Sequence, residues 1–162
     1  MTLGPAVVAA ALAQRTQSFT LSLAAPVAEA TPLFGPVRER EWSPHWAPSF
    51  LHPPEGAQQE GAVFTTRTPS GYEQVWLLTE YDPAGGRVAY AVVMPNFLAV
   101  TITIRVVADG PQRSTAIVTY RRSALVPRAN DEVNTLDAAW AAHQGPQWEA
   151  AINAALAKGR AR

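Results

Sequence analysis

The sequence contains no cysteine and only three histidines. Without cysteine the chain cannot form disulfides, use a thiolate nucleophile or build a cysteine-based zinc site. His45, His52 and His143 are not spaced like the histidine pairs that bind zinc from one helix. We therefore expect neither a metal site nor a cofactor.

The chain also lacks an excess of charge of either sign. Its 13 basic and 13 acidic residues cancel, and the run Arg38-Glu-Arg-Glu41 alternates in sign. Arg121 and Arg122 form a lone basic pair rather than a stripe. Because proteins that bind nucleic acid normally carry a basic surface, we predict no nucleic-acid partner.

Long hydrophobic runs are missing as well. The segment from Leu3 to Ala13 is too short to span a bilayer, and no lysine or arginine precedes it as in a secretory signal. We predict no membrane span and a cytoplasmic protein, with export through this weakly signal-like segment as the alternative. Residues 1–17 are interpreted as an N-terminal extension or helix.

What the chain does have is apolar residues, at 48% of the sequence against 16% charged residues. With 162 residues this balance predicts one globular domain, which we place at residues 18–162. The run from Ser18 to Leu23 alternates with period two, as in a strand with one covered face.

The second half of the chain is rich in the same alternation. We predict strands at residues 62–67, 73–82, 87–94, 97–108 and 113–125, with 49–52 as a short edge strand. Short turns between them favour an antiparallel meander. The alternation predicts that Ile102, Ile104, Val118 and Tyr120 face the core. It predicts that Thr101, Thr103, Thr119 and Arg121 face solvent.

Helical spacing appears on both sides of these strands. Two short helices, 27–34 and 37–42, are separated by Gly35-Pro36. A longer helix is expected from Asn130 or Asp131, and Gly145-Pro146 should kink or break it. Its expected apolar stripe consists of Val133, Leu136, Trp140, His143, Trp148, Ile152, Ala155 and Leu156.

This order of elements predicts an α+β, helix-grip fold. A curved antiparallel sheet of six or seven strands would wrap around a long C-terminal helix, with two short helices after the first strand. The long helix must bury its apolar stripe on the concave side of the sheet.

Local motifs add a resemblance to a known family. They are Pro36–Trp42 with Trp46, Gly61–Phe64, Val75-Trp76 with Tyr81–Pro83, and Thr119-Tyr120 with Ala124-Leu125. Over Ser18 to Leu156 the chain resembles the SRPBCC superfamily, most closely its small bacterial members. That superfamily includes START-related lipid carriers and proteins similar to plant pollen allergens and polyketide cyclases. The resemblance implies an apolar cavity between the sheet and the C-terminal helix. Residues 1–17 and Gly145-Pro146 depart from the usual pattern.

Aromatic and polar residues on the expected inner surfaces are the candidates for binding a ligand there. They are Trp42, Trp46, Phe64, Trp76, Tyr90, Met94, Tyr120, Trp140 and His143. Plain core packing is the alternative role for each of them. Glu39 or Glu41 could face the cavity as an acid or base, although alternating charges on a short helix are typical of a solvated face.

Three functions remain open from the sequence. The first is the binding of a small apolar or amphipathic molecule, lipid-like or polyketide-like, in a cavity of roughly 300–1,000 Å³. The second is a cyclase- or hydratase-type enzyme using Tyr120, His143 or Glu39 as acid or base. The third is a structural domain whose cavity its own side chains fill. No Gly-x-Ser-x-Gly motif or phosphate-binding loop is present, so we assign no catalytic residue. A homodimer is compatible with all three functions.

Overall fold

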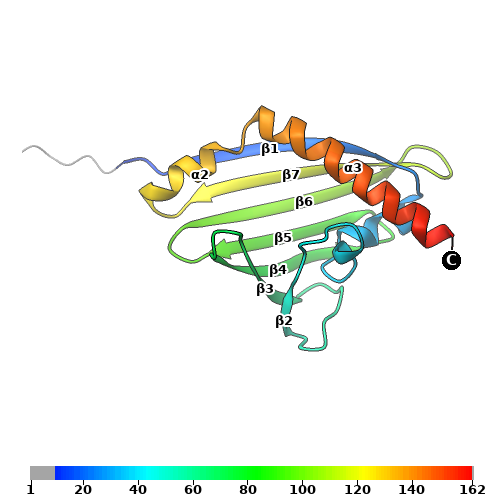
Figure 1. Ribbon diagram of the computed structural model, residues 1–162, viewed down its shortest axis with the longest axis horizontal. Coiled ribbons are helices and arrows are strands. Elements are labelled where there is room, and N and C mark those ends of the chain that lie inside the picture. Colours follow the sequence, from blue (N-terminus) through cyan, green and yellow to red (C-terminus); the bar gives the residue numbers. More distant parts are fainter. Residues whose placement is uncertain (1–9, 162) are drawn as a thin grey trace, which may run out of the picture.

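The computed structural model describes residues 10–161, which form one antiparallel sheet with helices on its concave face (Figure 1). The sheet has seven strands in the order β1-β7-β6-β5-β4-β3-β2. The strands are β1 (Gln14–Leu23), β2 (Ser49–His52), β3 (Val63–Arg67), β4 (Glu73–Asp82), β5 (Arg87–Met94), β6 (Leu98–Ala108) and β7 (Ser114–Ala124). The α-helices are α1 (Val27–Ala30), α2 (Asn130–Asn134) and α3 (Ala138–Arg160), and the 3₁₀-helices are η1 (Thr31–Phe34), η2 (Arg38–Glu41) and η3 (Pro127–Ala129).

The predicted order of elements is confirmed. Strands β2 to β7 form a meander, and β1 pairs with β7 to bring the first strand beside the last. Strand β1 begins at Gln14 rather than Ser18, because the polar residues that start it continue the pairing with β7. The predicted feature at Leu3 to Ala13 lies mostly outside the described residues, and its last residues, 10–13, form neither helix nor strand.

The predicted register of β6 and β7 is also confirmed. Ile102, Ile104 and Val118 are buried, whereas Thr101 and Arg121 are exposed. Cross-strand pairing then sets two rows on the inner face. One row joins Tyr90, Ile102 and Tyr120, and the next joins Trp76, Val92, Val100 and Arg122. These rows form the floor of the site described below.

Helix α3 differs from the prediction at Gly145-Pro146, because it continues through both residues for 23 residues in all. Pro146 lies on the exposed side, and the carbonyl that it leaves without an intrahelical donor belongs to the exposed Ala142. Gly145 lies on the buried side of the helix against Phe19 of β1. A Cβ at position 145 would lie 3.6 Å from the Phe19 Cβ. The helix packs mainly on β1, at the edge of the sheet (Figure 1).

The predicted place of His143 on the buried stripe is wrong. His143 is exposed, and α3 buries Ala141 and Gly145 in this part of the helix, whereas the predicted burial of Ile152, Ala155 and Leu156 is confirmed. The reason is that α2 ends at Asn134 and a new helix begins with Asp137 as its N-cap. This restart changes the helical phase between Leu136 and His143.

Side chains of α3 also complete the backbone hydrogen bonding of β1. Glu149 accepts a hydrogen bond from the Ser22 N–H at 2.7 Å. The Asn153 amide accepts from the Ala24 N–H at 2.9 Å and donates to the Ser22 carbonyl at 2.9 Å. The C-terminal end of the outer edge of β1, at Ser22 and Ala24, is therefore paired with side chains of the helix. Across residues 10–161, none of the helices is long and apolar enough to cross a membrane.

Candidate functional site

The inner face of the sheet encloses a cavity of about 190 Å³, here called the inner cavity. Its walls come from the inward positions of β4 to β7, from α2 and from the turn between β3 and β4. They are Thr68, Gln74, Trp76, Val92, Met94, Leu98, Val100, Ile102, Tyr120, Arg122 and Glu132. Most of these side chains are apolar, and the polar ones gather at one end.

A second, smaller hollow of about 20 Å³ adjoins the inner cavity and is here called the acid pocket. Trp76, Ile102 and Tyr120 are walls of both. The remaining walls of the acid pocket are Phe34, Glu39, Tyr90, Ile104 and Trp148. Its volume matches one water molecule or one polar group of a ligand, since a water needs roughly 10–15 Å³ of such space.

Glu39 points inward because η2 is a 3₁₀-helix. With three residues per turn, positions 38 and 41 lie on one side of the helix and position 39 lies a third of a turn away. Arg38 and Glu41 form a surface ion pair at 2.7 Å on the outer side. Glu39 is thereby left on the side that faces the sheet, where it lines the acid pocket.

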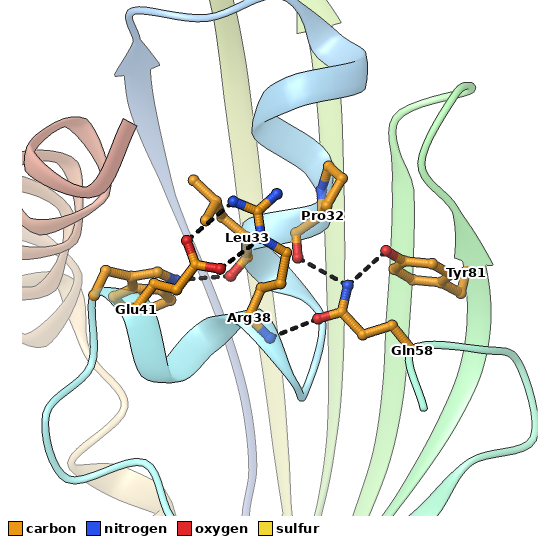
Figure 2. Close-up of polar contacts among 7 residues, drawn as sticks. Pro32, Leu33, Arg38, Glu41, Gln58 and Tyr81 are labelled. Carbon is orange, nitrogen blue, oxygen red and sulfur yellow. Dashed lines mark hydrogen bonds and ion pairs between the residues drawn. The ribbon is translucent and has the colours of Figure 1, made fainter. Parts of the chain in front are cut away.

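Gln58 holds this turn in place from the proline-rich loop between β2 and β3 (Figure 2). Its side-chain carbonyl accepts a hydrogen bond from the Arg38 N–H at 2.6 Å. Its amide group donates to the Pro32 carbonyl at 3.2 Å and to the Tyr81 hydroxyl at 2.7 Å. Gly35 leaves the space for this amide, because a Cβ there would lie 2.4 Å from the Gln58 Cδ.

The Glu39 carboxyl group is enclosed by protein without a partner. Burial raises its pKa from 4.5 to about 8, and no hydrogen bond or ion pair within residues 10–161 opposes this shift. Glu39 nevertheless keeps some accessible surface, which is consistent with a carboxyl group that faces the acid pocket rather than packed atoms. At pH 7 the group is therefore mainly a neutral acid, able both to donate and to accept a hydrogen bond.

The two tyrosines of the acid pocket are used differently. The Tyr90 hydroxyl donates to the Phe34 carbonyl at 2.7 Å, which ties η1 to β5. No hydrogen bond in the described chain uses the Tyr120 hydroxyl, and burial, followed by the nearby Glu39, raises the Tyr120 pKa. Every fully buried side-chain nitrogen or oxygen in residues 10–161 has a partner. The unpartnered Tyr120 hydroxyl must therefore contact the open space of the cavity.

Arg122 closes the opposite end of the inner cavity. Its guanidinium donates to the Thr135 hydroxyl at 3.0 Å, lies 3.6 Å from a carboxylate oxygen of Glu132, and sits over the Trp140 ring at 5.4 Å. The side chain is only 17% exposed. This cationic end has partners from both α2 and α3 and belongs to the packing of those helices.

A larger groove of about 770 Å³ lies outside the sheet-and-helix interior. It runs between the loop after η2 and the β3–β4 hairpin, and it shares Thr68 and Gln74 with the inner cavity. Trp46 lines this outer groove, while its ring packs on Phe64 and Trp76 at 5.8 and 5.3 Å. The Trp46 indole N–H donates to the Pro36 carbonyl at 2.7 Å. Trp46 thus lies between the outer groove and the aromatic residues of the inner face.

Of the candidates named from the sequence, Trp76, Tyr90, Met94 and Tyr120 meet at the inner cavity or the acid pocket. Others pack within aromatic clusters and line neither hollow. Trp42 lies against Trp148, with ring centroids 4.9 Å apart, and Trp140 lies against Tyr120 at 5.1 Å. Phe64 is fully buried between Trp46, Phe50, Trp76 and Tyr90.

Two expectations are corrected by this geometry. His143 is exposed on α3, where its ring is hydrogen-bonded to Gln147 at 3.0 Å, so it does not reach the interior. The inner cavity is also smaller than the expected range of roughly 300–1,000 Å³. Phe19 packs against Trp140 and Trp148 at 5.8 and 5.4 Å, and these rings fill the space under α3.

Sequence reasoning left Trp148 and Arg122 out of the site and favoured a solvated Glu39. The alternating charges of residues 38–41 are typical of a solvated helix face, so they give no sign that Glu39 points inward. Its inward orientation depends on the 3₁₀ geometry of η2. A usable pattern exists for Arg122, because it shares the inward face of β7 with Val118 and Tyr120. The described residues contain no cluster of three histidine, aspartate or glutamate side chains that could hold a metal ion.

Known proteins were compared with this chain at the levels of sequence and structure. No family model and no curated protein matches the sequence. Solved structures do match. Norcoclaurine synthase from Thalictrum flavum, in complex with dopamine and hydroxybenzaldehyde, has a TM-score of 0.67 at 12% identity, covering 98% of this chain and 95% of the other.

Two further structures agree. Ara h 8.0201 has a TM-score of 0.59 at 14% identity, covering 90% of this chain and 99% of its own. A protein from Thermobifida fusca has a TM-score of 0.59 at 21% identity, covering 83% and 90%. Identities this low show the fold alone. The seven-stranded antiparallel sheet, the short helices after β1 and the long C-terminal helix, together with these matches, establish that the chain has the helix-grip fold.

Proposed function

We propose that this chain binds a small, largely apolar molecule in the inner cavity, with one polar group of that molecule in the acid pocket. The observation that carries the proposal is the unpartnered Glu39 carboxyl group at the end of an apolar cavity. Burying an ionisable group without a partner costs free energy. Groups held in this state occur preferentially at functional sites.

The size of the cavity limits the ligand. At about 190 Å³ the inner cavity lies below the roughly 300–1,000 Å³ of pockets that bind drug-sized ligands. A single substituted ring fits this space, whereas a long acyl chain would require α3 or the Phe19 cluster to move. The proposal therefore favours a small ring compound over a large lipid.

The solved relatives of this fold support a small-molecule function in general terms. Norcoclaurine synthase, in the structure named above, holds two small aromatic compounds. A purely structural role fits the aromatic filling beneath α3 but gives no reason for an unpartnered Glu39. We therefore rank binding above a structural role.

Isothermal titration calorimetry with isopropenylbenzene tests the proposal. We expect a dissociation constant on the order of 10–100 μM, as for a small ligand buried in an apolar site. Val100→Phe should weaken binding at least about tenfold, because Val100 lines the inner cavity and the larger ring would occupy it. Ala116→Phe is a poorer choice, because Ala116 is fully buried but does not line the cavity.

The matched control is Val107→Phe on the same strand. Val107 is 49% exposed on the outer face, so this variant should bind like the parent protein. If neither the parent nor Val107→Phe binds the probe, or if Val100→Phe binds as well as both, the proposal is wrong.

A second candidate function is acid–base catalysis on the bound molecule, and the raised pKa of Glu39 is the observation that favours it. A carboxyl group with a pKa of about 8 is close to neutral pH, where general acids and bases are most effective. In such a reaction Glu39 would donate its proton to the ligand and recover one from solvent or product. Glu39→Gln should then abolish conversion of any ligand that the parent protein turns over, while isopropenylbenzene still binds.

A further inference from the structure

The acid pocket brings two unused hydrogen-bonding groups to one water-sized space. Glu39 reaches it from η2 and Tyr120 from β7, and no hydrogen bond within residues 10–161 occupies either side chain. The two groups are electrostatically close, since the Glu39 carboxyl contributes to raising the pKa of the Tyr120 hydroxyl. Near neutral pH both are uncharged, and each carries an O–H donor.

The other polar groups around the pocket are already used or are donors as well. The Tyr90 hydroxyl donates to the Phe34 carbonyl, and the Trp76 indole N–H donates to the Thr66 hydroxyl at 2.9 Å. Trp148 carries an indole N–H, which can only donate. The pocket is thus richer in donors than in acceptors, and a suitable ligand atom is one that accepts without donating.

A carbonyl oxygen meets this requirement. It has two lone pairs and no hydrogen, so it can accept from Glu39 and Tyr120 at the same time. It is also uncharged, so placing it among Phe34, Ile102 and Ile104 costs less than placing a cation there. A protonated amine would need several acceptors and would require Glu39 to ionise in this apolar space.

We propose that the acid pocket binds the carbonyl oxygen of a small aromatic or cyclic ketone or aldehyde, through hydrogen bonds donated by Glu39 and Tyr120. This inference rests on the proposed function, because the body of the ligand occupies the inner cavity. Trp76, Ile102 and Tyr120 wall both spaces, so the carbonyl is attached to the ring directly or by a very short link.

A matched set of ligands tests the proposal by calorimetry. Acetophenone carries the carbonyl, isopropenylbenzene replaces its oxygen with a CH₂ group, and α-methylbenzylamine carries a cationic nitrogen at a similar place. The measured quantity is the affinity for acetophenone divided by the affinity for isopropenylbenzene. This ratio isolates the hydrogen bonds, because the two ligands have nearly the same shape.

The variants separate donation from size and charge. Glu39→Leu should lower the affinity ratio about tenfold and Tyr120→Phe about fivefold, because each removes one donor to the carbonyl. Glu39→Gln keeps an N–H donor at the same place and should stay within about threefold of the parent. Tyr72→Phe, on the exposed Tyr72, is the control and should leave the ratio unchanged.

A vibrational measurement gives a second readout. When bound, the carbonyl stretch of ¹³C-labelled acetophenone should lie at lower frequency in the parent protein and in Glu39→Gln than in the double variant Glu39→Leu with Tyr120→Phe. In the double variant, which has neither donor, binding should move the stretch to higher frequency than in water. Both signatures are expected together if the carbonyl lies in the acid pocket.

Three results would overturn the inference. If isopropenylbenzene binds but the affinity ratio in Glu39→Leu and in Tyr120→Phe equals that of the parent protein, the proposed function stands and the carbonyl assignment fails. If α-methylbenzylamine binds more tightly than acetophenone and loses its affinity in Glu39→Gln, the pocket recognises a cation. If none of the three ligands binds, the proposed function fails and the inference fails with it.

Discussion

The inner cavity and the acid pocket that adjoins it form one space, whose two ends hold an ionisable side chain in opposite states. At one end Arg122 is charged, contacts Thr135 and Glu132, and lies over Trp140. At the other end Glu39 has no partner among the described residues and is mainly neutral at pH 7. The difference teaches that burial alone does not mark a site: the partnered group belongs to the packing, and the unpartnered one is free to meet a ligand.

The largest expected effect comes from removing the aromatic support of the Arg122 end. Trp140→Ala should lower the free energy of unfolding by about 3 kcal/mol, because its ring packs on Phe19, Tyr120 and Arg122 while remaining half-buried. Urea melts measure this loss. The exposed Leu125→Ala should cost less than about 0.5 kcal/mol. A loss below about 1 kcal/mol for Trp140→Ala would mean that this end is not held by packing.

Glu39 should make the free energy of unfolding depend on pH. The Glu39 pKa is raised in the folded state, so the folded protein binds this proton more tightly than the unfolded chain does. The stability from this group is complete below about pH 4.5 and is lost as pH rises through about 8. Glu39→Gln cannot lose a proton. It should match the parent near pH 5 and exceed it by about 1–3 kcal/mol at pH 9.

Urea melts at several pH values measure this difference. Glu60→Gln, at an exposed position, is the control and should shift stability by less than about 0.5 kcal/mol at every pH. Parallel pH profiles for Glu39→Gln and the parent would show that Glu39 is solvated, and the contrast between the two ends would disappear.

The smallest effect is expected from Arg122 itself. Arg122→Met keeps much of the packing on Trp140 but removes the hydrogen bond to Thr135 and the contact with Glu132. We expect a loss of about 1 kcal/mol, nearly constant between pH 5 and 9, because both partners can turn to water. A gain in stability on this substitution would show that Arg122 is as poorly compensated as Glu39.

Much of the sheet could be predicted because period-two alternation is a local property. The alternating pattern around Ile102, Ile104 and Val118 predicts that these residues face the core, and the structure confirms this. Tyr120 followed from the same alternation, and Trp76 and Tyr90 were named as aromatic candidates on the neighbouring strands, so the strand side of the site was accessible to sequence reasoning.

The helical side of the site depends on features that no local pattern contains. Glu39 turns inward because η2 is a 3₁₀-helix fixed by Gln58, which lies in a distant loop. His143 turns outward because the chain restarts its helix at Asp137. The volume of the cavity depends on how Phe19, Trp140 and Trp148 pack against one another, which is a property of the assembled interior.

The hydrogen bonds between α3 and β1 have a consequence for how copies of this chain meet. An edge strand with free N–H and C=O groups is a template for another strand, and such pairing leads to dimers or fibres. Asn153 offers Ser22 and Ala24 the acceptor and donor that a neighbouring strand would offer, and Glu149 takes the Ser22 N–H. The opposite edge, β2, is only four residues long. Addition of a strand at the Ser22 end of β1 would therefore require the Glu149 and Asn153 side chains of α3 to give up these hydrogen bonds, so the helix protects this end of the edge from pairing with another chain.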